Sequence, residues 1–272
     1  MIGALISIAL AVAAWATTAR SSEAIAPEPR ATALTSASLP LAGNTSTNTL
    51  AGVSADGHYS LAVADLDTGQ SLTHGNGSFD TASIVKVDIL AALLYQLQQE
   101  GAEPSSSQDS LATAMIELSD NASATALFRQ IGGKAALDDF NDVIGLTETD
   151  VGADGYWGLT QTTAADQITV LRTVFGSGSV LTDESQSYIQ ALMSDVADSQ
   201  RFGVSAVADD AALKVGYLQR SATGLWDVTS IGVAHVGGRT YMIAFLSKDN
   251  LTLQEGMALA DDAVTAAVDG FN

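Results

Sequence analysis

The order of strand-like and helical segments constrains the fold of this chain more than any other feature. The strand-like runs occupy residues 58–73, 211–219, 226–236 and 239–247. Asp67-Thr68-Gly69 divides the first run and Gly237-Gly238 joins the last two, and both are turn signals of β-hairpins. Because strands stand at both ends and helices fill the middle, we predict an α/β (α+β) fold. Its antiparallel sheet is built from N- and C-terminal strands flanked by helices, with an inserted all-helical lobe.

Helical patterns fill the region between these strands, and one more follows the last strand. They occupy residues 83–99, 111–118, 122–131, 134–144, 162–175, 183–196 and 252–268. Residues 146–158, between the fourth and fifth helix, form a long polar loop without periodicity. Loops of this length in compact domains are usually functional or mobile, so this loop is a candidate for function.

The N-terminal region indicates an exported protein. Residues 2–19 contain no charge, which is typical of a signal peptide or membrane anchor, and we assign residues 1–26 to this segment. Residues 27–54, rich in Ser, Thr, Ala and Pro, are predicted as a flexible linker, and residues 55–272 as the folded domain. No cysteine follows the apolar segment, which argues against a lipid-anchored lipoprotein. We therefore expect a domain that is secreted, at the cell-envelope exterior or in the periplasm, with its N-terminal segment cleaved or retained as an anchor.

Composition excludes several classes of function. With 31 acidic and 11 basic residues, the formal net charge is −20, which repels nucleic acid and anionic lipid. The absence of cysteine excludes disulfides, Cys-ligated zinc, iron–sulfur clusters and thiol catalysis. His58, His74 and His235 form no metal-binding pattern. We therefore expect a monomer with no nucleic-acid partner, no metal and no cofactor.

Ser83 and Lys86 stand three residues apart in an otherwise apolar helical run, so they share one helix face. Burial disfavours a charged amine and lowers its pKa. A partly neutral lysine beside a hydroxyl can accept the hydroxyl proton and so generate a nucleophile. The alternative is a serine at a helix start with a lysine that reaches solvent, and a lone S-x-x-K motif does not decide between the two.

Two further short motifs follow in order. Ser119-Asp120-Asn121 interrupts two helical segments, and Lys214-Val215-Gly216 lies on a strand before the final hairpin. Alone, the first reads as a helix-capping cluster and the second as ordinary strand residues. Together with Ser83-x-x-Lys86, they resemble the motif set of penicillin-recognising serine hydrolases, the superfamily of class A β-lactamases and penicillin-binding proteins. The similarity extends from about residue 59 to the C-terminus.

The resemblance implies acyl transfer at a serine. Ser83 would attack the amide carbonyl of the substrate and become acylated, with Lys86 as its base or proton relay. Ser119 would pass a proton toward the leaving nitrogen, working with Lys86 and Lys214. Asp120 would hold its loop by hydrogen bonds.

The resemblance also implies a set of substrate-binding residues. Asn121 would hydrogen-bond the side-chain amide of the substrate, and Lys214 would supply positive potential for a substrate carboxylate. The backbone N–H groups of Ser83 and Tyr217 would form an oxyanion hole. Gly216 would let the substrate backbone lie close to its strand.

The chain departs from the family pattern in three places. The family's third motif usually carries Thr or Ser where this chain has Val215, so carboxylate recognition would fall to Lys214 and Arg220 or be weaker. Class A enzymes carry a loop glutamate that activates the deacylating water. Glu148 is the candidate here, with a solvated loop carboxylate as the alternative. The span from Ser83 to the second motif is shorter than typical for class A, which predicts a trimmed helical lobe.

Three functions remain open from the sequence. The first is an exported β-lactamase-type serine hydrolase, an antibiotic-resistance activity that opens β-lactam amides through an acyl-Ser83 intermediate. The second is a D-alanyl-D-alanine peptidase or penicillin-binding protein, whose partner is a peptidoglycan stem peptide rather than a small β-lactam. The third is a non-catalytic cell-wall binding relative. Val215 and the unsettled role of Glu148 keep the third open, whereas the intact Ser83, Lys86, Ser119 and Lys214 argue against it.

Overall fold

The computed structural model describes residues 50, 53 and 58–271. The predicted signal peptide or anchor, residues 1–26, lies outside them, and so does the predicted linker, residues 27–54, apart from Leu50 and Val53. Within the described residues, no helix combines the length and the hydropathy needed to cross a membrane.

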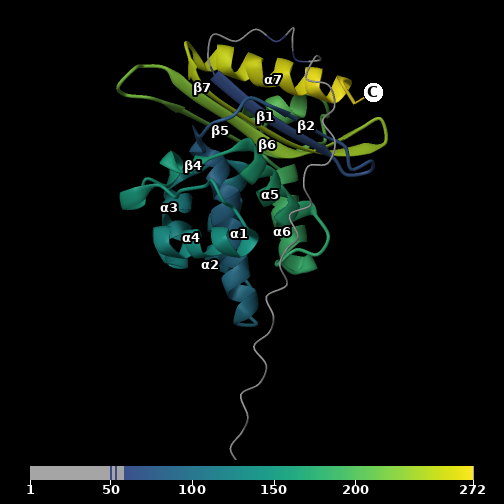
Figure 1. The fold of residues 1–272 in the computed structure, drawn as a ribbon. Helices are drawn as coiled ribbons and strands as arrows, with labels where there is room; N and C mark the ends of the chain where they lie inside the picture. The colour runs from purple at the N-terminus through teal and green to yellow at the C-terminus, as the bar shows by residue number, and fades with distance from the viewer. Residues whose placement is uncertain (1–49, 51–52, 54–57, 272) are drawn as a thin grey trace, which may run out of the picture. The chain divides into compact units, whose positions relative to one another are not determined.

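A five-stranded antiparallel sheet forms the centre of the fold, with the strand order β2-β1-β7-β6-β5 (Figure 1). The strands are β1 (His58–Asp65), β2 (Ser71–His74), β5 (Ala212–Gln219), β6 (Trp226–Val236) and β7 (Arg239–Asn250). N-terminal β1 pairs with C-terminal β7 in the middle of the sheet, with Leu61 opposite Phe245. The predicted pairing of the terminal strands, and with it the fold class, is confirmed.

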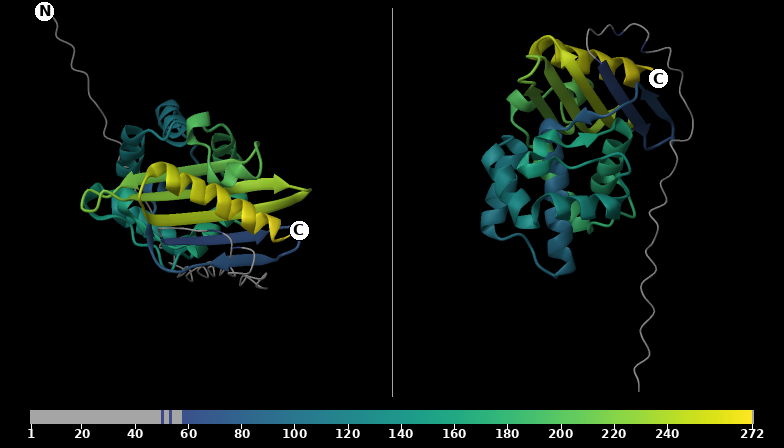
Figure 2. Two further views of the ribbon diagram at one scale, coloured as in Figure 1. Left: turned by 90° about the horizontal axis from the view of Figure 1, so that it is seen from above. Right: turned by 60° about the vertical axis from the view of Figure 1, so that its left-hand side comes forward.

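The helices divide between the two faces of this sheet. They are α1 (Val85–Gln99), α2 (Ser106–Glu117), α3 (Asn121–Ile131), α4 (Gly133–Ile144), α5 (Ala164–Phe175), α6 (Asp183–Ser194) and α7 (Leu253–Asp269). Figures 1 and 2 show α7 across one face, while α1 to α6 form the helical lobe against the other. The short 3-10 helix η6 (Gly203–Ala206) packs against α7 and β6. The helix α2 begins earlier than predicted, because Ser105 and Gln108 form a reciprocal capping box at its start.

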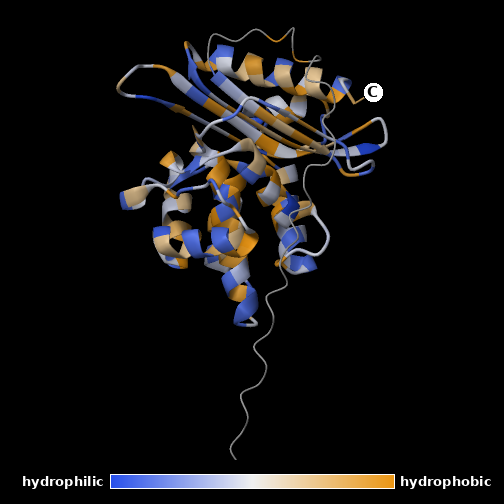
Figure 3. Ribbon diagram, viewed as in Figure 1, coloured by the Kyte–Doolittle hydropathy of each residue, from blue (hydrophilic) through white to orange (hydrophobic). Residues whose placement is uncertain are grey.

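Helix α1 runs through the middle of the helical lobe. Its residues from Val85 to Leu94 are all buried, and its last turns are not. Figure 3 shows the corresponding change from hydrophobic colouring along much of α1 to hydrophilic colouring at its far end. Burying one large aliphatic side chain contributes about 2 kcal/mol, so this run of apolar residues fixes the helix firmly and carries Lys86 and Asp88 into the interior with it.

A second, two-stranded sheet ties the long polar loop to the segment before Ser83. It pairs β3 (Phe79–Asp80) with β4 (Gln161–Thr162), and the N–H of Thr81 donates to Thr160 O at 2.8 Å. The loop itself contains two short 3-10 helices, η3 (Ala153–Gly155) and η4 (Trp157–Leu159). Strands of two residues carry no periodicity in the sequence, and we did not predict this sheet. It places the loop beside the candidate nucleophile.

Candidate active site

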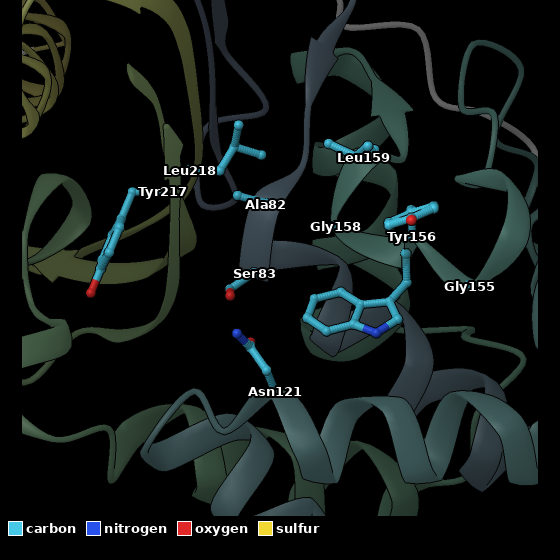
Figure 4. A pocket seen from close by; sticks show the side chains of 10 residues that line it. Ala82, Ser83, Asn121, Gly155, Tyr156, Gly158, Leu159, Tyr217 and Leu218 are labelled. Atoms are coloured by element: carbon cyan, nitrogen blue, oxygen red, sulfur yellow. The ribbon is translucent and has the colours of Figure 1, made fainter. Parts of the chain in front are cut away.

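Ser83 lies in a 3-10 helix, η2 (Ala82–Ile84), which runs directly into α1. It is half-buried and lines a cavity of about 290 Å³. Figure 4 shows Ser83 in the centre, with Tyr217 and Leu218 on one side and Gly155, Tyr156, Gly158 and Leu159 on the other. Ala82, the residue before it, has a φ of +48°, a conformation that costs a non-glycine residue about 1 kcal/mol. The chain therefore holds a strained turn where it presents the serine hydroxyl.

Gly216 on β5 packs directly against this turn. A Cβ at this position would stand 2.5 Å from the backbone N of Ser83 and 2.9 Å from the carbonyl O of Thr81. We predicted that Gly216 leaves room for substrate backbone. The structure adds a second reason, because the absent side chain also makes room for the backbone of the candidate nucleophile, while the first reason stays a prediction. The buried hydroxyl of Thr229 adds a link here, since it lies 3.0 Å from Thr81 O and 3.2 Å from Gly216 O.

Lys86 is fully buried one turn beyond Ser83 and contacts the second motif. Its Nζ donates to Ser119 O at 2.5 Å, to Ser119 Oγ at 3.1 Å and to Asn121 Oδ1 at 2.8 Å. Burial lowers the pKa of Lys86 to about 8, and the nearby charge of Asp120 partly opposes this. Roughly one tenth of such an amine is neutral at pH 7.

The structure brings Ser83 and Lys86 to the same site without a hydrogen bond between them. Among the described residues, the hydrogen bonds of Lys86 Nζ go to Ser119 and Asn121 and none goes to Ser83 Oγ. A charged ammonium has three N–H donors, so these three acceptors occupy it completely. A neutral amine has two N–H donors and a lone pair. Loss of one proton therefore frees one position of Lys86 Nζ to accept a proton.

Lys214 on β5 is fully buried near Lys86. Burial, and next the charge of Lys86, lower the pKa of Lys214 to about 7. Its Nζ donates to the carbonyl O of Val215 at 3.3 Å. Lys214 does not line the cavity, and neither does Val215, whose side chain is buried in the core.

The second motif forms the turn between α2 and α3. Ser119 has a φ of +58°, a second strained non-glycine position at the site. Asp120 caps α3 by accepting the N–H of Ser123 at 2.6 Å, in line with its predicted hydrogen-bonding role. Asn121 lines the cavity, and its Oδ1 accepts a hydrogen bond from Lys86 Nζ at 2.8 Å. The Nδ2 donor of Asn121 is therefore the end left for a ligand, and Figure 4 shows this side chain pointing toward Ser83.

Trp157 closes the site from the loop side. Its Nε1 donates to Thr125 Oγ1 on α3 at 3.2 Å, and its ring centroid lies 5.2 Å from Lys86 Nζ. An aromatic face at this distance attracts a cation while it excludes water from the amine. No sequence motif singles out Trp157, because nothing in a polar loop indicates which ring turns inward.

The structure does not bring Glu148 to Ser83. Glu148 is exposed and does not line the cavity, and its backbone N–H donates to Asp166 Oδ2 at 2.9 Å. Asp166 also accepts the hydroxyl of Thr149 at 2.7 Å, so it anchors this part of the loop from α5. The anchored backbone thus leaves the Glu148 side chain in solvent, which fits the alternative of a solvated loop carboxylate.

Asp88 is a buried acid that no pattern in the sequence singles out. It is 1% exposed, and neither carboxyl oxygen has a hydrogen-bond partner among the described residues. Burial, and next the charge of Asp166, raise the pKa of Asp88 to about 7. A helical aspartate usually lies at the surface, so periodicity could not have revealed this position.

Arg220 is engaged in ion pairs within the protein, and its share in carboxylate recognition stays a prediction. Its guanidinium pairs with Asp80 and, at 2.9 Å, with Asp227 Oδ2. Both carboxylates are nearly inaccessible to solvent. Diverting Arg220 to a ligand would leave two buried acids without their counter-ion.

The three histidines lie outside this site. His58 is exposed near Asp249, His74 stacks on the ring of Tyr59, and the ring of His235 contacts a neighbouring threonine. In the part of the chain that the structure describes, no group of three or more His, Asp or Glu residues is arranged to hold a metal ion.

Comparison with known proteins gives a consistent result. Residues 45–108 and 101–271 match the sequence model described as Beta-lactamase enzyme family. LppW of Mycobacterium tuberculosis, named as a lipoprotein, is 30% identical over 222 residues, which span 76% of this chain and 66% of that protein. The curated match thus covers slightly less than two thirds of LppW.

Two solved structures share the fold. A class A beta-lactamase from Bacteroides cellulosilyticus has a TM-score of 0.68 at 16% identity, covering 79% of this chain and 92% of that one. A mutant of PBP-A, solved as an acyl-enzyme complex with penicillin G, has a TM-score of 0.69 at 20% identity, covering 79% and 90%. At these identities the likeness concerns the fold alone.

Proposed function

Because this chain belongs to the beta-lactamase enzyme family, we propose that it is an exported serine hydrolase whose Ser83 attacks the amide carbonyl of a β-lactam-type substrate. One observation carries the proposal. Two buried lysines with lowered pKa values, Lys86 and Lys214, lie behind a cavity that Ser83 lines, and Lys86 is hydrogen-bonded to the second motif. Amines with lowered pKa values beside a hydroxyl in a cavity are the expected signature of an activated nucleophile.

Acylation begins from the neutral form of Lys86. Its free lone pair accepts the proton of Ser83 Oγ while that oxygen forms a bond to the carbonyl carbon. The negative charge that develops on the carbonyl oxygen is bound by the backbone N–H groups of Ser83 and Tyr217. The position of Ser83 at the start of α1 supports this role, because the N-terminus of a helix favours negative charge. Strand β5 is the edge of its sheet, so its outward N–H groups have no strand partner.

The leaving nitrogen takes its proton from Ser119. The carbon–nitrogen bond breaks as Ser119 Oγ donates, and Ser119 regains a proton from the ammonium of Lys86, 3.1 Å away. Lys214 lies close to Lys86, and its pKa is lowered to about 7. The two amines are therefore both charged in at most about half of the molecules at neutral pH. The acyl group then remains on Ser83 as an ester. Asn121 Nδ2 serves as the donor to the side-chain amide of the substrate.

Release of the acyl group is the slow step in this proposal. Deacylation needs a base that activates water, and none of the described residues that line the cavity is a carboxylate. We predicted Glu148 for this role, and its exposed position outside the cavity speaks against it. Acyl-Ser83 therefore accumulates. The same observation favours the second candidate, a D-alanyl-D-alanine peptidase or penicillin-binding protein acting on peptidoglycan, because β-lactams acylate such proteins and stay bound.

Incubation of the full-length protein with benzylpenicillin and with its methyl ester tests the proposal. The intact mass reports the adduct, and absorbance reports the loss of the β-lactam ring. We expect one adduct per chain that is hydrolysed only slowly, and no adduct in the Ser83→Ala control. Rapid loss of many equivalents of the β-lactam per chain would contradict slow deacylation and support a β-lactamase. Absence of an adduct with both compounds would contradict either enzyme and leave the non-catalytic relative.

A further inference from the structure

The cavity beside Ser83 has no charged wall. Ten residues line it, and in the described part of the chain none of these ten is charged. Its polar groups are the hydroxyls of Ser83, Tyr156 and Tyr217 and the amide of Asn121. The rest is glycine, alanine, leucine and Trp157. A carboxylate entering this space would lose water and meet no ionised donor in exchange.

The cations described for this site, Lys86, Lys214 and Arg220, are occupied or shielded. Lys86 and Lys214 are fully buried behind the cavity, and Lys86 Nζ already donates to three acceptors of the second motif. With its pKa near 7, Lys214 is charged in only about half of the molecules at neutral pH. Arg220 neutralises two buried carboxylates and does not line the cavity. Position 215 offers no hydroxyl, and its valine is fully buried.

We propose that this site selects uncharged acyl donors with an aromatic group, and that a free carboxylate on the substrate slows acylation of Ser83. The proposal rests on the proposed acylation of Ser83 and names the substrate class of that site. Tyr156 and Tyr217 stand on opposite sides of Ser83 in Figure 4, and Trp157 also lines the cavity, so a flat apolar group of the substrate would meet aromatic walls. The formal net charge of −20 adds a repulsion against any anion that approaches.

A matched pair of compounds separates charge from reactivity. Benzylpenicillin and its methyl ester carry the same β-lactam ring and the same aryl side chain, and only the free acid is an anion. The second-order rate constant for adduct formation on Ser83 is measured by intact mass for both compounds with the full-length protein. We expect the ester to exceed the acid by roughly tenfold or more, since the acid enters without an ionised partner.

Leu218 offers a gain-of-function variant with a neutral control. It lines the cavity and is half-buried, so a longer polar side chain can reach solvent there. Leu218→Lys places an ammonium at the cavity wall, and Leu218→Met changes the shape without adding charge. We expect Leu218→Lys to shift the acid-to-ester ratio of rate constants toward the acid by roughly tenfold. Leu218→Met leaves that ratio near the wild-type value.

Each outcome decides the proposal. A wild-type rate constant for the acid equal to or above that of the ester overturns the selection of uncharged substrates, while the acylation of Ser83 stands. An equal shift in ratio for Leu218→Lys and Leu218→Met overturns the electrostatic explanation. No adduct with either compound overturns the proposed function and this inference with it.

Discussion

Gly216→Ala tests how strand β5 positions the nucleophile. The added Cβ would stand 2.5 Å from Ser83 N, 2.7 Å from Thr229 Oγ1 and 2.9 Å from Thr81 O. Ordinary contacts of this kind begin near 3.4 Å, so the Ser83 turn and the strand must separate by roughly 1 Å. A displacement of that size at a reacting group costs up to about 10²-fold in rate. Overpacking costs about 1–3 kcal/mol of unfolding free energy.

Gly232→Ala is the matched control for this variant. Its Cβ would meet the carbonyl O of Ala212 at 2.3 Å, a similar overlap within the same sheet that does not involve Ser83. We measure the acylation rate constant by intact mass and the unfolding free energy by urea titration for both variants. We expect both to lose stability and only Gly216→Ala to lose acylation per folded molecule. Wild-type acylation by Gly216→Ala would refute the positional role of this strand.

Three further predictions follow from the charged groups of the interior. The acylation rate constant should rise about tenfold per pH unit under acidic conditions and level off near pH 8, because only neutral Lys86 accepts the proton. A flat profile from pH 6 to 9 would contradict this. Asp88→Asn should raise the melting temperature more at pH 8 than at pH 5. With its pKa raised to about 7, the folded state binds a proton between roughly pH 4 and 7 that the unfolded state has lost, so ionisation destabilises the fold at higher pH. Equal shifts in thermal unfolding at both pH values would count against a charged Asp88. Arg220→Gln should lower the unfolding free energy by about 3 kcal/mol, because Asp80 and Asp227 lose their buried counter-ion. Urea titration checks this, and a change below about 0.5 kcal/mol would refute it.

Periodicity and motif order predicted the frame of the fold and the members of the candidate site. The strand patterns at residues 58–73 and 239–247 led to the pairing of β1 with β7. The motif order led to Ser83, which lines the cavity, and to Lys86, which lies behind it and contacts the second motif. Such predictions are possible because a buried strand or helix must repeat its apolar residues, and because a short motif in a fixed context is specific.

Contacts between distant segments could not be predicted in the same way. Glu148 was chosen by its place in the loop, whereas its orientation depends on the hydrogen bonds that Asp166 makes from α5. Glycine is needed at position 216 because the backbone of Ser83, distant in sequence, lies against it, and no local sequence pattern indicates such a contact. Likewise, the burial of Asp88 depends on helices that surround α1 in the assembled lobe.

The central claim is that Ser83 is an acylated nucleophile, and locating the penicillin adduct within the chain tests it most directly. The full-length wild type and the Ser83→Ala variant are incubated with the methyl ester of benzylpenicillin, digested and analysed by mass spectrometry. We predict that the added mass is found on Ser83 of the wild type and is absent from the variant. An adduct on another residue, or equal labelling of the variant, would contradict the claim.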